Sequence, residues 1–440
     1  ANFFVLCYNK AMNVDITPYQ NKKICIALSG GGDSVALLHY FRARAAANGI
    51  ALSAVHCEHG IRGEASKADY RFVTELCAMW GVPLYQFSAD CKKLAEEQKV
   101  SLETAARNFR YGCFEELLQS GKTDCIATAH HQGDNAETVL FHICRGASLT
   151  GASGIHERGG YIRPFLSVSK TEISRYLQEN NLQYCTDQTN FDEKITRNAL
   201  RLRVLPLLEE IVPGAMACIS RFSSLAEEDD AFLYALAEKL LLPVTDGVGV
   251  VFCPDKPIFR RACLLALKKL GVEKDYTLTH LELLFALQSL QNGDALSMPD
   301  GVEAVREYDR VVFYRPQKKD EEEIAFGLGN FTLAGVSFRV EGCKSRLTDG
   351  YRYIDVNKIP ATAVFRTRRE GDVFQKFGGG SKKLKNYLID KKIPVRERDK
   401  LVLLADGKEI LAIIGGEISE KVKVEENSAV ARIITNENNL

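Results

Sequence analysis

Three features that often reveal a protein's class are missing from this sequence. It has no run of about 18 consecutive apolar residues, so it contains no candidate membrane-spanning helix. Its formal net charge is zero at pH 7, so overall charge predicts neither a nucleic-acid nor a membrane partner. Its 13 cysteines include no C-x-x-C pair, which argues against a disulfide framework and favours reduced thiols packed as small apolar groups. The first residues, ANFFVLCYNK, lack the pattern of a secretory signal, so we expect a cytoplasmic protein.

The length of 440 residues predicts more than one domain, because a single core stops growing at roughly 250 to 300 residues. A break at IVPG, residues 211–214, separates an alternating pattern from a helical one. Short alternating apolar runs begin near residue 295 and indicate strands. We therefore expect three domains, over residues 1–214, 215–294 and 295–440.

Residues 1–150 alternate short apolar runs with amphipathic stretches, which is typical of an α/β domain built on a parallel sheet. We expect strands at residues 23–28, 51–56, 83–87 and 125–129. We expect helices at residues 34–47, 64–80, 101–118 and 134–144. Ligands of such sheets bind beyond the carboxyl ends of the strands, so the loops there are the candidate site.

The loop after the first predicted strand reads SGGGDS, from Ser29 to Ser34. Glycines let backbone N–H groups converge on an anion, and the helix that follows directs its positive end to the same place. The loop lacks the Lys-Ser/Thr pair of a Walker A motif and is not G-x-G-x-x-G. It therefore predicts a phosphate cradle of another kind, the alternative being a tight turn capped by Asp33 or Ser34.

Two further loops belong to the same predicted edge. The second strand ends in VHCEHGIRGEAS, in which His56 is the second residue. The fourth strand ends in TAHHQGDNAETVL, which contains His130 and His131. Asp134 and Glu137 are three residues apart and share one face of a helix start. Such a pair can hold Mg²⁺ or an ammonium group, or simply stabilise the helix N-terminus.

Two arginines precede the fourth strand. Arg107 and Arg110 share one face of the predicted helix at residues 101–118. They either neutralise phosphate charge or form a solvated basic face.

Taken together, these motifs resemble a known family. SGGGDS resembles the PP-loop of ATP pyrophosphatases. SGGGDS, VHCEHGIRGEAS, ETAARNFRY, HHQGDNAET, IRPFL and TDQTNFDEKITRNALRLRVLP, in this order, resemble tRNA(Ile)-lysidine synthetases. The resemblance is strong as far as Ala215 and covers the rest of the chain by its general plan. The resemblance implies a PP-loop domain, a helical domain and a small C-terminal α+β domain. It also implies ATP-dependent joining of free lysine to C2 of the wobble cytidine in the CAU anticodon of tRNA(Ile), through an adenylated tRNA.

The resemblance also implies roles for residues. ATP would bind at the loop and at His56, with Mg²⁺ near Asp33 and Glu137. Adenylation and lysine binding would fall to Asp33, Arg107, Arg110, His130, His131, Asp134 and Glu137. Gly133 stands where many relatives have a polar or acidic residue. Whether Asp134 and Glu137 hold lysine or metal stays open, and so does a homodimer.

Two basic segments are candidates for tRNA contact. The first segment predicts a helix with one basic face, which is either an RNA-binding surface or a solvated stripe. The candidate residues of this face are Lys194, Arg197, Asn198, Arg201 and Arg203. The second, residues 381–400, has eight Lys or Arg against three acids, a local excess of five. There we expect Lys382, Lys383 and Lys385 to contact phosphates, and Tyr387, Phe374 and Phe377 to favour base stacking. A basic surface helix is the alternative.

Two other functions compete with the lysidine hypothesis. A PP-loop sulfur transferase acting on tRNA is disfavoured in the versions that need paired cysteines or an iron–sulfur cluster, because C-x-x-C is absent. An RNA-binding protein without activity is disfavoured because the glycine loop and the acid pair are both intact. The sequence thus predicts an ATP-dependent tRNA ligase.

Overall fold

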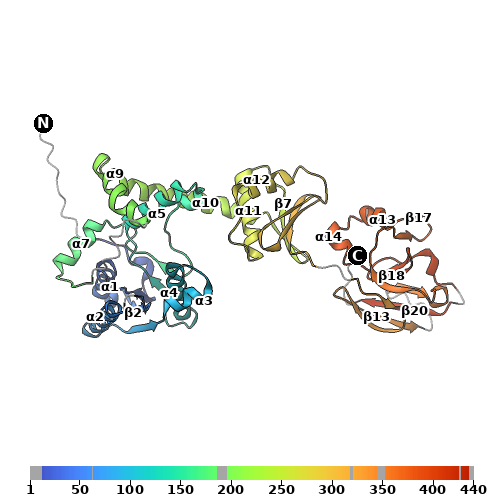
Figure 1. Ribbon diagram of the computed structural model, residues 1–440, viewed down its shortest axis with the longest axis horizontal. Helices are drawn as coiled ribbons and strands as arrows, with labels where there is room; N and C mark the ends of the chain where they lie inside the picture. The colour runs from blue at the N-terminus through green and yellow to red at the C-terminus, as the bar shows by residue number, and fades with distance from the viewer. Residues whose placement is uncertain are drawn as a thin grey trace. The chain divides into compact units, whose positions relative to one another are not determined.

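The computed structural model describes residues 12–61, 63–185, 196–317, 321–343, 352–425 and 428–435. The chain divides into two compact units, Ala1–Phe232 and Leu233–Leu440. Figure 1 draws their helices and strands, coloured from blue at the N-terminus to red at the C-terminus. None of the helices in these described ranges is both long and apolar enough to cross a membrane.

The first unit is built on a five-stranded sheet in the order β3-β2-β1-β4-β5, with every neighbouring pair parallel. Its strands are β1 (Lys23–Ala27), β2 (Ala51–Glu58), β3 (Leu84–Ser88), β4 (Cys125–Ala127) and β5 (Tyr161–Ile162). The strand order reverses direction between β1 and β4, and a crevice for ligands forms at such a switch point. The glycine loop follows β1 and the His130 loop follows β4, so both predicted loops lie at this crevice.

Helices cover both faces of this sheet because its strands alternate two sets of buried side chains. Ile24 and Ile26 pack with residues of α1 and α2, whereas Cys25 packs with Phe114 and Leu117 of α4. The helices of the unit up to Ile211 are α1 (Gly32–Ala45), α2 (Glu64–Trp80), α3 (Cys91–Gln98), α4 (Leu102–Gln119), α5 (Gln132–Cys144), α6 (Leu149–Ala152), α7 (Lys170–Glu179), α8 (Thr196–Ala199), the π-helical turn η4 (Leu200–Val204) and α9 (Leu205–Ile211). The strands and helices predicted within residues 1–150 are confirmed to within two positions at each end, and α3 was not predicted.

The long helix α10 (Ala215–Glu238) begins in the first unit and ends in the second. Beyond it, the structure corrects the expectation of a wholly helical segment over residues 215–294. The strands β6 (Leu241–Val244) and β7 (Gly247–Val251) pair with strands from beyond residue 294, in the sheet order β6-β7-β10-β9-β8. The partners are β8 (Ala295–Ser297), β9 (Glu303–Glu307) and β10 (Arg310–Tyr314), and α11 (Lys256–Lys269) and α12 (Leu278–Leu287) pack on this sheet. Strand pairing therefore joins the two sides of the predicted 294/295 boundary.

The remaining strands confirm the β-rich C-terminal part. One sheet has the order β11-β15-β18-β19-β16-β17 and the other has the order β12-β13-β20-β14. Their strands are β11 (Ile324–Ala325), β12 (Gly329–Leu333), β13 (Val336–Cys343), β14 (Arg352–Asp355), β15 (Val364–Thr367), β16 (Val373–Gln375), β17 (Ser381–Lys383), β18 (Val402–Asp406), β19 (Glu409–Ile413) and β20 (Val430–Thr435). The helices here are α13 (Leu384–Asp390) and α14 (Val395–Arg398).

Candidate functional site

A pocket of about 520 Å³ opens at the carboxyl ends of β1, β2 and β4. Its lining includes Ser29, Gly31, Gly32, Asp33, Ser34, His56, Arg110, Tyr111, His130, Lys170, Tyr184, Cys185 and Arg201. The pocket therefore brings together side chains from segments as far apart in the sequence as those of Ser29 and Arg201.

The three glycines of the loop differ in backbone conformation and in what a side chain at each position would meet. Gly30 has φ +92°, a conformation that favours glycine. Gly31 is the N-cap of α1, and a Cβ there would meet only Ser29 Oγ at 3.5 Å, so the space beside it is open. A Cβ on Gly32 would lie 3.0 Å from Leu177 Cδ1, so Gly32 permits close packing against α7.

Two serines fasten the loop from within. Ser29 Oγ accepts a hydrogen bond from Gly31 N at 3.3 Å, and Ser34 Oγ donates to Gly31 O at 2.8 Å. Because Gly31 has no side chain to cap α1, the helix start presents its first-turn N–H groups to the pocket side. The alternative of a turn capped by Asp33 or Ser34 is not what the structure contains. α1 begins at Gly32, two positions before the predicted start.

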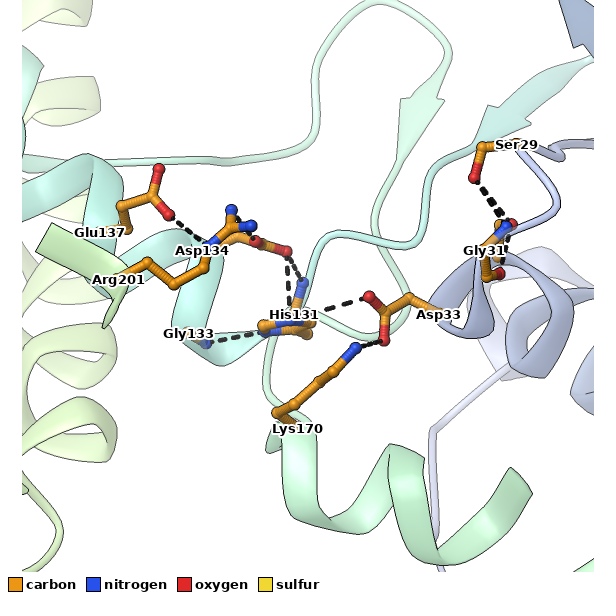
Figure 2. A network of polar contacts seen from close by, with 10 residues as sticks. Ser29, Gly31, Asp33, His131, Gly133, Asp134, Glu137, Lys170 and Arg201 are labelled. Atoms are coloured by element: carbon orange, nitrogen blue, oxygen red, sulfur yellow. Dashed lines mark hydrogen bonds and ion pairs between the residues drawn. The ribbon is translucent and has the colours of Figure 1, made fainter. Parts of the chain in front are cut away.

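Asp33 lies between two cationic or polar partners (Figure 2). Its Oδ1 is 2.5 Å from Lys170 Nζ, and its Oδ2 is 4.0 Å from His131 Nε2. His131 Nε2 is also 3.6 Å from Asp134 Oδ2, so the histidine bridges the glycine loop and the start of α5.

His131 is the N-cap of α5, and Asp134 completes the cap. Gly133 N donates to His131 Nδ1 at 3.0 Å, and His131 N donates to Asp134 Oδ2 at 2.9 Å. Since Nδ1 accepts, a neutral His131 carries its proton on Nε2, which is directed to the two aspartates. Asp134 therefore has the helix-stabilising role, and its carboxylate also contacts the site.

Glu137 is buried and is paired with an arginine from a distant segment. Its Oε2 accepts a hydrogen bond from Arg201 Nε at 2.9 Å, while Arg201 Nη2 lies 3.3 Å from Asp134 Oδ1 (Figure 2). Burial raises the pKa of Glu137, and Arg201 opposes this rise. One guanidinium thus holds together the two carboxylates that the sequence placed on one helix face.

The other predicted histidines are near the same pocket. His56 is buried and its Nδ1 donates to Leu28 O at 2.8 Å, which leaves Nε2 as the acceptor nitrogen of the neutral ring. His130 Nδ1 lies 2.9 Å from Thr128 Oγ1. Burial lowers the pKa of His130 to about 4, against a smaller opposing effect of Asp134, so this ring is neutral at pH 7.

Of the two predicted arginines, Arg110 lines the pocket and Arg107 does not. Burial lowers the pKa of Arg110, which lies in the wall beside Tyr111. Arg107 is exposed, with its guanidinium carbon 4.8 Å from the centre of the Tyr111 ring. A third arginine, Arg163 of the IRPFL motif, donates to His156 O nearby.

The two predicted metal ligands are each paired with a cation, Asp33 with Lys170 and Glu137 with Arg201. Within the ranges that the structure describes, no three His, Cys, Asp or Glu side chains are arranged to hold a metal ion. Asp33 is 31% exposed in its side chain and lies beside the glycine loop, whereas the Glu137 side chain is 6% exposed. One carboxylate together with substrate phosphates is a common way to hold Mg²⁺, and Asp33 fits that arrangement while Glu137 does not.

The predicted basic helix around Arg201 has a different character from the one expected. Lys194 lies outside the described residues, and Asn198 is buried. Arg197 packs over Phe141 of α5, with its guanidinium carbon 5.1 Å from the ring centre. Arg201 contacts the carboxylates of the site, and Arg203 is exposed. These side chains do not form one RNA-facing stripe, because two of the arginines contact α5.

In the C-terminal segment the stacking expectation is corrected. Phe374 and Tyr387 are buried in one apolar cluster, with ring centres 4.8 Å apart, and only Phe377 is exposed among the three predicted rings. Lys382 Nζ is 2.5 Å from Asp390 Oδ2, whereas Lys383 and Lys385 are exposed. Lys382 and Lys383 belong to strand β17, and Lys385 to helix α13.

Sequence reasoning missed Lys170 and misplaced Arg201. Lys170 opens a helix, where a cation is disfavoured by the helix dipole, and it follows the IRPFL motif. That unfavourable position was the available signal. Nothing in the local pattern of Arg201 indicates that its partners are 64 and 67 residues away.

Known proteins resemble the chain along nearly its whole length. Residues 7–208 match the PP-loop domain family, and residues 364–435 match the TilS substrate C-terminal domain family. The tRNA(Ile)-lysidine synthase of Caldanaerobacter subterraneus subsp. tengcongensis is 32% identical over 438 residues, which cover 94% of each chain. That of Bacteroides thetaiotaomicron is 31% identical over 422 residues, covering 92% of this chain and 93% of the relative. A crystal structure of a TILS C-terminal domain matches 26% of this chain and 98% of its own, at 24% identity and a TM-score of 0.24.

Proposed function

Because this chain belongs to the tRNA(Ile)-lysidine synthase family, we propose that it joins lysine to C2 of the wobble cytidine, position 34, of tRNA(Ile) with a CAU anticodon. ATP is consumed to AMP and pyrophosphate, and the lysidine product reads AUA and is charged with isoleucine. One observation carries the proposal: the glycine loop and Arg201, which holds Asp134 and Glu137, line a single pocket.

The first half-reaction is adenylation of the cytidine. Its O2 attacks the α-phosphorus of ATP, the bond from that phosphorus to the bridging oxygen breaks, and pyrophosphate leaves. Arg110 lies in the pocket wall, where burial strengthens its attraction for phosphate charge that develops in this step. The neutral His130 ring adds no positive charge, and it can donate or accept a hydrogen bond with the cytosine base.

The second half-reaction is attack by the lysine ε-amino nitrogen on C2, with AMP as the leaving group. Asp134 and Glu137 would bind the ammonium form and then accept the proton that the nitrogen must lose. Arg201 now occupies both carboxylates, so the incoming ammonium would share them with the guanidinium. Free lysine as the amine belongs to this proposal.

Mg²⁺ would be held by Asp33 with the ATP phosphates, and it would offset phosphate charge. Glu137, which was also expected to bind metal, does not line the pocket beside the glycine loop; because it shares Arg201 with Asp134, we assign it to lysine together with Asp134. The tRNA would be held by Arg203, Lys383 and Lys385, which are exposed. A homodimer and a cytoplasmic location stay predictions.

The test is transfer of labelled lysine to unmodified tRNA(Ile) with a CAU anticodon, in the presence of ATP. We expect label in the RNA together with one AMP and one pyrophosphate for each lysine incorporated. A transcript with U34 in place of C34 is the matched control and should take up no label. Absence of label with the C34 transcript, or equal labelling of both transcripts, would refute the proposal.

A further inference from the structure

Lys170 is the one lysine that lines the pocket in the described part of the chain. Its Nζ lies 2.5 Å from Asp33 Oδ1, and it shares the pocket wall with Gly31, Gly32 and Ser34. Its side chain is 56% exposed, so the ammonium group is accessible to a ligand in the pocket.

Packing of α7 on α1 fixes this position. Leu177 of α7 lies where a Cβ on Gly32 would come within 3.0 Å, and Tyr176 Oη is 2.8 Å from His39 Nδ1 of α1. A capping box fixes the start of α7, since Ser169 Oγ accepts from Glu172 N and Glu172 Oε2 accepts from Ser169 N. Lys170 is therefore presented to the glycine loop by a fastened helix end.

Fold stability does not account for a lysine here. A cation in the first turn of a helix opposes the helix dipole. An ion pair that is about half exposed contributes little, typically less than about 1 kcal/mol. A lysine at this position is therefore better explained by the negative charge of a ligand bound in the pocket.

We propose that Lys170 is a catalytic cation that binds the departing pyrophosphate, in the role of the lysine that the glycine loop itself lacks. Before ATP binds, its ammonium occupies the Asp33 carboxylate. With ATP in the loop, the ammonium moves to oxygens of the β- and γ-phosphates, and Asp33 becomes free to hold Mg²⁺. This inference rests on the proposed function, because it concerns the adenylation step.

The chemical step needs no proton from Lys170. The bond between the α-phosphorus and the bridging oxygen breaks, and its electron pair stays on the pyrophosphate oxygen. Lys170 stays protonated and offsets the charge that accumulates there, which an arginine can also do from a similar reach.

The experiment compares Lys170→Met and Lys170→Arg in the full-length enzyme, with Lys93→Met as the matched control. Lys93 is 74% exposed and pairs with Glu97 on its own helix, so its loss tests removal of a lysine as such. Pyrophosphate release is measured with tRNA(Ile) and ATP in the absence of lysine, and inhibition by added pyrophosphate is measured separately. Thermal unfolding of each variant reports stability.

We expect Lys170→Met to lower kcat for pyrophosphate release about 100-fold and to weaken inhibition by pyrophosphate about tenfold or more. Lys170→Arg should stay within about tenfold of the wild type, and Lys93→Met should equal it. Unchanged inhibition by pyrophosphate in Lys170→Met, or an equal defect in Lys170→Arg, would overturn the inference. If the wild type released pyrophosphate in a Lys170-dependent way but never incorporated lysine, only the proposed function would fail.

Discussion

Replacing Glu137 by Gln separates the two half-reactions, because the substitution keeps the shape of the side chain and removes its charge. The Glu137 side chain is 6% exposed and accepts a 2.9 Å hydrogen bond from Arg201. Gln can still accept that hydrogen bond through its Oε1, so we expect a loss of about 1–3 kcal/mol in stability and a folded protein.

The effect on lysine follows from the charge that is removed. Two unit charges about 4 Å apart interact with about 4 kcal/mol at an effective dielectric constant of 20. Asp134 remains and takes part of the ammonium's charge, so we expect a net loss of about 3 kcal/mol, or roughly a hundredfold in KM for lysine. Pyrophosphate release without lysine should stay within about threefold of the wild type.

The assay measures the two steps separately in Glu137→Gln and in Glu97→Gln. Glu97 is exposed on α3 and serves as the matched control for loss of one glutamate charge. Pyrophosphate release is followed without lysine, and incorporation of labelled lysine is followed across a lysine titration. If Glu137→Gln abolished pyrophosphate release in the absence of lysine, the residue would act in adenylation and the assignment to lysine would be refuted.

Three further outcomes are expected. Gly31→Val should raise KM for ATP about 100-fold or more, because the added methyl groups extend into the space of the phosphates. The unfolding temperature should change little, because a Cβ at this position meets only Ser29 Oγ. An unchanged KM for ATP would refute the assignment of the loop as a phosphate cradle. Neutralising Lys383 and Lys385 together should weaken tRNA binding and reduce the slope of log affinity against log salt by about 0.7–0.9 per lost contact, whereas Lys382→Met, whose ammonium is already paired with Asp390, should change the slope less; equal slopes in a salt titration would leave these lysines as a solvated surface. Burial lowers the pKa of His130 to about 4, so the unfolded chain binds the proton first as the pH falls below 6.5. The neutral, buried His130 therefore does not reduce the free energy of unfolding above pH 6.5, and it reduces that free energy progressively as the pH falls toward 4. Between pH 7.5 and pH 5, urea unfolding should show the wild type losing about 2 kcal/mol more stability than His130→Gln. Equal losses of stability in the two proteins would contradict the burial argument.

Local pattern predicted the strands of the first α/β part of the chain, up to Cys144, and all of its α-helices except the short α3, because the predicted elements have the apolar period of their own type. The same reasoning failed at residues 241–251, where two short strands lie between helices. β6 and β7 pair with each other as a hairpin, and β7 also pairs with β10, which follows only after α11, α12, β8 and β9. The pairing with β10 joins the hairpin to later strands, and a pairing of that range leaves no periodic signal in a short window. The domain boundary predicted at residue 294 failed to match the sheet for this reason.

Aromatic residues in the basic C-terminal segment show a second limit. Phe374 and Tyr387 suggested stacking on bases, yet both are buried against each other. Composition counts an aromatic ring but does not say which face of an element it occupies. Exposure is decided by what packs on that face, and in this segment the only exposed ring of the three is Phe377.

The sequence by itself determined the glycine loop, the parallel sheet that presents it, and the histidine and acid residues at the end of β4, because each of these depends on short-range chemistry: φ freedom, strand period and helix capping. Only the tertiary structure decided how their charges are paired. Lys170 reaches Asp33 across 137 residues of sequence, and Arg201 reaches Glu137 across 64. Pairing of charges follows distance in space, which the packing of α7 on α1 and the course of the chain through η4 set, and no local rule of sequence contains that distance.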